Sequence, residues 1–276
     1  MFYLILAFCS SAMVSIVMRL SEGRIRGKLG MLMANYVVCT LVAAWEAGFD
    51  CLFPGVPGLP QTLVMGIFNG CLYLAGFVLL QRNVARSGVV LTSTFMKLGL
   101  LVTMVISTVF FGERPDTAQI IGFVLAVLAI LLMNEKRERG RFDPRVMLLM
   151  VTGGLCDGMS KIFEELGTQS LSGQFLFYTF LVAMVLCGIL AWRRGELPGL
   201  REWGFGLAIG VPNYLSCFFL LRSLSAVPGV IAYPVYSVAG ILLVTAAGVL
   251  LFRERLTGRQ KLAMGIILIA LVLLNL

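Results

Sequence analysis

Ten apolar runs, each close to the length of a membrane-crossing helix, occupy almost the whole of this 276-residue sequence. A bilayer core about 30 Å thick takes roughly 20 helical residues to cross. Short segments rich in Gly, Pro and charged residues separate the runs, so each run is predicted to form one helix. The expected fold class is an all-α integral membrane protein with ten transmembrane helices, at residues 2–19, 30–48, 61–81, 88–110, 117–134, 146–164, 172–192, 203–221, 229–251 and 258–275.

The composition excludes most classes of soluble enzyme. Apolar residues make up 59% of the chain and charged residues 13%, against about 25% charged in ordinary soluble domains. Histidine is absent, which rules out zinc sites built on His and Ser-His-Asp triads. The seven cysteines form no C-x-x-C pair and are interpreted as packing residues. We therefore expect no enzyme activity, no catalytic residues, no metal and no cofactor.

The basic residues are distributed very unevenly between the two sides of a ten-span chain. Of the 22 Lys and Arg residues, 18 fall in loops on one side, and only Arg114 and Arg222 fall on the other. Lys97 and Lys161 lie inside spans. Because basic loops stay cytoplasmic, we expect a multi-pass protein of the cell (inner or plasma) membrane with both termini non-cytoplasmic. The net charge of +8 is thus a topology signal rather than a nucleic-acid-binding surface.

The two halves of the sequence are similar to one another at a shift of 141 residues. Polar and glycine positions match in one register, as in the pairs Tyr73 and Tyr214, Gly88 and Gly229, Gly99 and Gly240, Glu113 and Glu254, and Gln119 and Gln260. Shared apolar character alone does not explain such matches, so we interpret them as a duplication. The predicted units are a first five-helix repeat at 1–135, a basic cytoplasmic linker at 136–145 and a second five-helix repeat at 146–276.

Five spans per unit reverse the direction in which the second unit enters the membrane. Two inverted repeats are the architecture of many secondary transporters, in which exchange of the two units' conformations converts an outward-open cavity into an inward-open one. Glu113 and Glu254 each begin a short turn before the last helix of a unit. They are interpreted as caps of those helices rather than ligands, because an acid is favoured near a helix start.

The segments 88–134 and 229–276 carry a pattern that resembles a known family. Each has a Gly- or Pro-marked helix, an acidic turn (GERPD at 112–116, FRERL at 252–256), and Gln and Gly at the start of the last helix. With the five-plus-five duplication, this chain resembles the EamA type of the drug/metabolite transporter superfamily. It departs from that pattern at Arg253, where Gly is usual. The resemblance implies transport of a small metabolite bound between the halves, within a superfamily whose substrates range from amino acids to nucleotide sugars and drugs.

Lys97 stands in the middle of the predicted fourth span. A cation at that depth is costly when it faces lipid, so it should face a wet cavity or a partner. One interpretation is an anion-binding group for a substrate carboxylate or phosphate, with Ser93 and Thr94 nearby on the helix. The alternative is a structural pair with Asp157 or with helix carbonyls.

Asp157 and Lys161 lie four residues apart in the predicted sixth span. That spacing places them on one helix face, with the acid N-terminal to the base, which is the favourable order for an ion pair. The pair is predicted to be either a proton-coupled switch or a permanent salt bridge near the outer mouth.

A set of amide, tyrosine and serine side chains within the spans suits an organic substrate of mixed polarity. Each Tyr offers an apolar face and one hydroxyl group. The alternative is that the tyrosines anchor the lipid interface. The candidate substrate-binding set comprises Asn35, Tyr36, Asn69, Tyr73, Tyr214, Tyr233, Tyr236 and Ser237.

The leading functional hypothesis is a secondary active transporter that moves a small polar organic metabolite by alternating access, with proton coupling left open. The alternative is a lipid or lipid-linked-sugar flippase or scramblase of the same superfamily. The expected partners are a small-molecule substrate and the lipid bilayer, with no nucleic acid, and the expected assembly is a monomer or homodimer.

Overall fold

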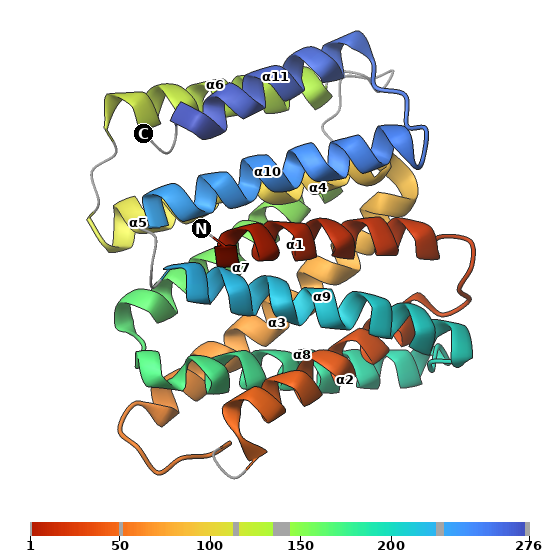
Figure 1. Cartoon of the computed structure of the whole chain (residues 1–276), viewed down its shortest axis with the longest axis vertical. Coiled ribbons are helices and arrows are strands. Elements are labelled where there is room, and N and C mark those ends of the chain that lie inside the picture. The colour runs from red at the N-terminus through yellow and green to blue at the C-terminus, as the bar shows by residue number, and fades with distance from the viewer. Residues whose placement is uncertain (1, 50–51, 113–115, 135–143, 225–228, 274–276) are drawn as a thin grey trace.

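The computed structural model describes residues 2–49, 52–112, 116–134, 144–224 and 229–273, and over these residues the chain is helical with no strand (Figure 1). The ten predicted spans each coincide with one helix, except that 88–110 is divided in two. The helices are α1 (Phe2–Ser21), α2 (Lys28–Ala47), α3 (Leu59–Ser87), α4 (Val89–Lys97), α5 (Leu100–Phe110), α6 (Thr117–Asn134), α7 (Pro144–Leu166), the 3-10 helix η2 (Gln169–Leu171), α8 (Ser172–Arg194), α9 (Leu200–Leu224), α10 (Gly229–Leu250) and α11 (Gly258–Leu273).

Seven helical segments are long and apolar enough to cross a membrane. They are α1, α2, α3, α4 together with α5, α7, η2 together with α8, and α9. Shorter apolar stretches lie in α6 and α10. The chain is therefore an all-helical, multi-pass membrane protein. The linker predicted at 136–145 lies almost entirely outside the described residues.

The break between α4 and α5 corrects the prediction of one continuous helix over 88–110. Leu98 and Gly99 form a turn between the two helices. A Cβ atom on Gly99 would lie only 2.5 Å from the backbone nitrogen of Gly154 in α7. The glycine thus lets this joint approach the backbone of α7, a tertiary contact that the hydropathy of the local sequence does not encode.

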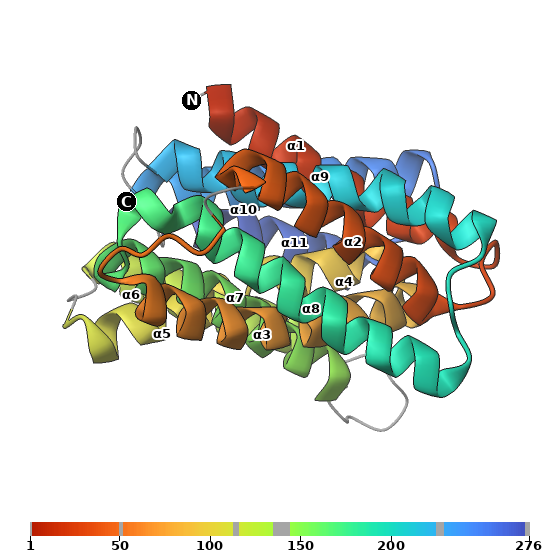
Figure 2. The same cartoon turned by 90° about the horizontal axis from the view of Figure 1, so that it is seen from below.

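The most extensive helix contacts correspond to one another when the two halves of the chain are exchanged. α1 packs on α9 and α10, and its counterpart α7 packs on α3 and on α4 with α5. α2 contacts α8 and α9, as α8 contacts α2 and α3. The counterparts α4 and α10 contact one another, and so do α6 and α11. Figure 2 shows helices of both halves interleaved in a bundle with a common direction.

Glycines spaced four residues apart allow close approach at two equivalent interfaces. Gly66 and Gly70 of α3 face α8, and a Cβ on Gly70 would lie 2.6 Å from a backbone oxygen of that helix. Gly206 and Gly210 of α9 face α2, where the matching distance from Gly210 is 2.9 Å. Small residues at such spacing let membrane helices pack backbone to backbone. These contacts fix α3 and α9, which both contribute to the central cavity.

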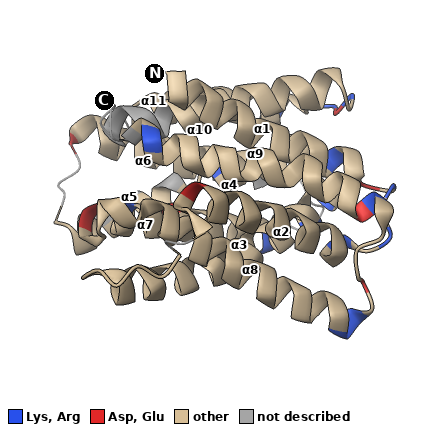
Figure 3. Cartoon of the chain, turned by 60° about the horizontal axis from the view of Figure 1, so that its bottom comes forward, with Lys and Arg blue, Asp and Glu red and all other residues tan. Residues whose placement is uncertain are grey.

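Most of the Lys and Arg residues that the structure describes lie toward one end of the bundle, where the ribbon of Figure 3 is coloured blue. Arg19 ends α1, Lys28 begins α2, Arg86 lies in the last turn of α3 and Arg194 ends α8. We call this the basic end. The described chain begins and finishes toward the other end, which we call the opposite end (Figure 3).

Candidate functional site

A cavity of about 80 Å³ lies at the centre of the bundle. Its walls come from α1, α3 and α4 of the first half and from their counterparts α7, α9 and α10 of the second. The lining is mostly apolar, with a few polar groups and two opposite charges. The lining residues are Ser11, Ala12, Val14, Ser15, Tyr73, Gly76, Phe77, Leu80, Ser93, Met96, Lys97, Gly153, Cys156, Asp157, Asn213, Ser216, Cys217, Tyr236, Gly240 and Val244.

Lys97 projects into this cavity from the last residue of α4. Its Nζ donates a hydrogen bond to Ser11 Oγ at 3.0 Å and lies 3.5 Å from the centroid of the Tyr236 ring. The C-terminal end of a helix favours a cation, and an aromatic face attracts one. Gly240 leaves room for the side chain, because a Cβ there would lie 3.3 Å from Lys97 Cε. Among the described residues, these contacts hold Lys97 in place without a directly bonded carboxylate.

Asp157 of α7 lines the same cavity, and the charge of Lys97 acts on its carboxylate. Within the described part of the chain, no hydrogen-bond donor contacts that carboxylate. The two groups thus balance one another electrostatically across the cavity. Lys97 was alternatively predicted to pair with Asp157. The two residues do not form a direct hydrogen bond, and both charged groups face the cavity.

Ser93 and Thr94, the two polar neighbours predicted to accompany Lys97, face different surroundings. Ser93 lines the cavity, is 4% exposed, and has no hydrogen-bond partner for its hydroxyl group. Thr94 instead donates to the Val90 carbonyl oxygen and faces Met264 of α11. Thr94, predicted to belong to the binding site, therefore does not line the cavity, because the turn of the helix directs its side chain toward α11.

Lys161 forms an ion pair with Glu165, with 2.7 Å between Nζ and Oε1. Lys161 does not line the cavity, whereas Asp157 does. The predicted ion pair between Asp157 and Lys161 is therefore corrected. Asp157 and Glu165 each lie four residues from Lys161, a spacing that allows an ion pair on a helix. Lys161 pairs with Glu165, whereas Asp157 lines the cavity together with Lys97.

Two of the predicted tyrosines form part of the cavity wall. The Tyr236 hydroxyl group is 3.0 Å from Ser216 Oγ, and the Tyr73 hydroxyl group is 2.9 Å from Cys217 Sγ. Tyr36 is fully buried behind them and donates to the backbone oxygen of Tyr73 at 3.0 Å. These three side chains are interior, so the alternative of an interfacial anchor does not apply to them.

The other predicted members of the set support helix contacts or lie beyond the cavity wall. Asn213 donates to Asn35, which joins α9 to α2, and Asn69 donates to Thr179, which joins α3 to α8. The Tyr214 hydroxyl group donates to Glu46 at 3.1 Å. Ser237 is buried outside the lining. The side chain of Tyr233 lies outside the described residues.

The sequence analysis missed several polar residues of the cavity. Ser11, Ser15, Ser216 and Cys217 all line it. Each is a small polar residue inside an apolar run, and such residues also occur commonly at helix contacts. Such residues can be recognised as cavity residues only once the structure is known. The hydrogen bond from Lys97 to Ser11 then shows which side of α1 faces the cavity.

A second, larger hollow of about 500 Å³ opens at the opposite end of the bundle. It is lined where α2, α7 and α9 finish, by residues that include Glu46, Glu164 and Arg222. The Arg222 guanidinium lies 5.0 Å from the centroid of the Phe218 ring, which also lines this hollow. The bundle is thus hollowed at the opposite end, where α2, α7 and α9 finish.

Comparisons with known proteins identify the family. A model of the EamA-like transporter family matches residues 1–135 and 144–276. The pseudopaline exporter CntI, from the Pseudomonas aeruginosa strains PAO1 and UCBPP-PA14, is 26% identical over 169 residues, which cover 61% of this chain and 58% of that protein. A solved crystal structure superposes with a TM-score of 0.64 at 15% identity, over 99% of this chain and 94% of the other. That superposition shows a shared fold.

Proposed function

Because this chain belongs to the EamA-like transporter family, we propose that it is a secondary transporter that moves a small polar organic solute across its membrane by alternating access. The observation that carries the proposal is the central cavity, into which Lys97 and Asp157 both face. Charged groups inside a membrane bundle are costly and mark solute or proton pathways. The similarity to an exporter supports outward movement of the solute.

The proposed architecture is ten spans arranged as inverted repeats at 1–135 and 146–276, joined by a linker at 136–145. The most extensive helix contacts of one half have counterparts in the other, as expected if one unit is a duplicate of the other. Three counterpart pairs of helices build the cavity wall. A rearrangement that exchanges the conformations of the units would therefore open the same cavity toward the other side.

Lys97 is the proposed anchor for an anionic group of the solute. Its ammonium group has three N–H donors, and Ser11 takes one of them. The remaining donors, together with the unpartnered hydroxyl group of Ser93, can receive a carboxylate or phosphate. Tyr73 and Tyr236 offer apolar faces to the rest of the solute.

Asp157 is the proposed site of charge compensation. Its carboxylate lines the same cavity as Lys97 and carries the opposite charge. An anion bound to Lys97 would add a negative charge beside Asp157, in surroundings where uncompensated charge is expensive. A second positive charge then restores the balance, carried either by a proton on Asp157 or by a cationic group of the solute. This arrangement couples occupancy of the two charged groups.

The test is efflux from proteoliposomes preloaded with a defined mixture of amino acids, small carboxylates and organic phosphates. Loss of one charge-assisted hydrogen bond costs about 1.5–3 kcal/mol, so Lys97→Met should lower transport of the carried species by roughly 10- to 100-fold. Lys161→Met is the matched control, because its ion pair with Glu165 lies outside the cavity. Efflux from Lys97→Met at the rate of the wild type would refute the role of Lys97.

A fluorescent-lipid arm of the same experiment tests the flippase alternative. Liposomes carrying a labelled phospholipid in one leaflet are treated with an external quencher, and protein-dependent loss of protected fluorescence reports lipid translocation. The proposal requires efflux of a soluble species without lipid translocation. Lipid translocation without solute efflux would replace the proposed activity with the flippase alternative.

A further inference from the structure

Glu254, in the turn between α10 and α11, caps the start of α4. Its two carboxylate oxygens accept hydrogen bonds from the backbone nitrogens of Val89 at 2.8 Å and Val90 at 3.2 Å. Gly88 has a φ of +81°, and a Cβ there would lie 2.8 Å from Glu254 Oε1. The prediction that Glu254 caps its own last helix is therefore wrong. It instead fastens a helix of the other half of the chain.

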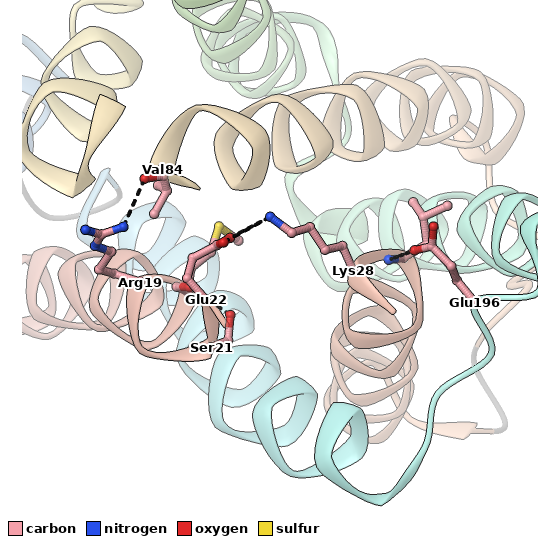
Figure 4. A network of polar contacts seen from close by, with 8 residues as sticks. Arg19, Ser21, Glu22, Lys28, Val84 and Glu196 are labelled. Atoms are coloured by element: carbon pink, nitrogen blue, oxygen red, sulfur yellow. Dashed lines mark hydrogen bonds and ion pairs between the residues drawn. The ribbon is translucent and has the colours of Figure 1, made fainter. Parts of the chain in front are cut away.

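Arg19, at the end of α1, completes this corner at the basic end. Its Nε lies 3.6 Å from Glu254 Oε1. Its guanidinium donates a hydrogen bond to the Val84 carbonyl oxygen in α3 at 3.4 Å, which Figure 4 shows. The cation thus lies at the C-terminal end of α3 and the anion at the N-terminal end of α4. Both placements match the helix dipoles. One ion pair therefore joins α1, the α3–α4 junction and the α10–α11 turn.

The helix that Glu254 fastens is the one that carries Lys97. α4 runs only from Val89 to Lys97 and is separated from α5 by the turn at Gly99. Its far end is bonded to α1 through Ser11, and its near end is linked to α1 through Arg19 and Glu254. Ser11 and Arg19 are eight residues apart, which is about 12 Å along a helix. α4 is thus tied to α1 at both of its ends.

We propose that the Arg19–Glu254 ion pair closes the basic end of the bundle and controls access to the Lys97 cavity from that side. The inference rests on the proposed transport function and adds to it a device that the cavity itself does not contain. At the basic end these contacts link α1, α3, α4 and the α10–α11 turn, whereas the opposite end contains the hollow of about 500 Å³. Release of the ion pair detaches the start of α4 from α1 and exposes the cavity to the basic end, while the bond from Lys97 to Ser11 still holds the other end of α4.

The backbone beside Glu254 is strained in the closed arrangement. Arg253 has a φ of +52° and is the one non-glycine residue with positive φ among those described. Its repeat counterpart Gly112 has a φ of +67°, so both turns need the left-handed conformation. A side chain makes that conformation less stable, whereas glycine adopts it freely. Arg253→Gly should therefore stabilise the closure, and Arg19→Gln or Glu254→Gln should weaken it.

The experiment measures access to Cys217, which lines the cavity. The other six cysteines are replaced by alanine, and a small membrane-impermeant methanethiosulfonate is applied separately to each face of the vesicles. Loss of a partly exposed ion pair should raise the rate of labelling from the basic end by about threefold to fivefold in both Arg19→Gln and Glu254→Gln. The double variant should label no faster than the faster single variant. Arg253→Gly should label more slowly than the parent protein.

Glu22→Gln is the matched control. Glu22 pairs with Lys28 at 2.9 Å at the same end (Figure 4), but its pair joins the end of α1 to the start of α2 and leaves α4 untouched. Labelling from the basic end that is equal in Glu254→Gln, Arg19→Gln and Glu22→Gln would overturn the closure, as would labelling of none of them. Because the readout needs no transported solute, a failure of the transport assay leaves this result interpretable. Thermal unfolding of each variant confirms that labelling comes from folded protein.

Discussion

The stability of the empty protein should depend on Lys97 and Asp157 together rather than on either alone. The two charges face one cavity, and Lys97 acts on the Asp157 carboxylate without a direct hydrogen bond between them. Two unit charges roughly 4 Å apart interact by about 4 kcal/mol at an effective dielectric constant near 20, which is an upper bound for two groups that share a cavity without a direct hydrogen bond. Water in the cavity reduces that figure, so we expect a coupling free energy of about 1–2 kcal/mol.

The measurement is a double-mutant cycle with Lys97→Met and Asp157→Asn, followed by equilibrium unfolding in detergent. Each single substitution leaves one cavity charge without its counterpart and should lower the free energy of unfolding by about 1–3 kcal/mol. The double variant removes both charges and should lose clearly less than the sum of the single losses. Lys161→Met is the control, because an i, i+4 pair on a helix contributes only about 0.2–0.5 kcal/mol.

Additivity of the two single losses within about 0.3 kcal/mol would refute the reasoning. In that case Lys97 and Asp157 would not sense one another across the cavity, and each would be stabilised by its own neighbours. For Lys97 those neighbours are Ser11 and the Tyr236 ring. The proposed role of Asp157 in charge compensation would then lose its physical basis, while the anchoring role of Lys97 would remain open to the transport test.

Two further predictions concern the helix contacts that position the cavity. Gly99→Ala should destabilise the protein by about 1–3 kcal/mol, because the new Cβ would lie 2.5 Å from the Gly154 backbone nitrogen. Gly265→Ala, on the open face of α11, is the control and should be neutral or stabilising by up to ~1 kcal/mol. Thermal unfolding compares the two variants, and equal melting temperatures would contradict the contact between Gly99 and α7. Glu202→Ala should lower the free energy of unfolding by about 1–3 kcal/mol, since Glu202 accepts hydrogen bonds from three backbone nitrogens. Glu22→Ala, which removes a surface ion pair, should lower it by at most ~1 kcal/mol. A smaller loss of stability in Glu202→Ala than in Glu22→Ala, measured in the same assay, would exclude a stabilising role for these hydrogen bonds.

The positions of the helices could be predicted from the sequence because the determining signals are local. Apolar length sets where a membrane helix can run, and Gly, Pro and charged residues mark where it stops. Gly58 before α3 and Gly195 after α8 both have positive φ and lie at such stops. The α4–α5 break escaped prediction because Gly99 is needed there for a contact with α7, and a distant backbone leaves no mark on the hydropathy of its partner.

The position of Lys97 was also predictable, for an energetic reason. A charge inside an apolar run requires compensation, so Lys97 was expected to face a wet cavity or a partner, with Asp157 as one candidate partner. Thr94 and Tyr214 carry no such requirement, and their directions depend on the rotation of α4 and α9 within the bundle. Sequence spacing gives the faces of a helix relative to one another, but tertiary packing decides which face meets the cavity.

The proposed duplication would account for the scaffold, while the residues that differ between the two halves supply the charged group of the cavity. At the 141-residue shift, Lys97 corresponds to Val238 and Tyr236 corresponds to Phe95, so the cation occurs in only one half, and only one of the two corresponding rings contacts it. Phe95 is buried outside the cavity lining. An anion anchored on Lys97 would therefore be held mainly by α4, even though the cavity wall is drawn equally from both halves. A rearrangement of the bundle can exchange the helix contacts of the two halves, but α4 and the solute bound to it must move together. The contacts at the two ends of α4 are therefore where the transport cycle would be most sensitive to mutation.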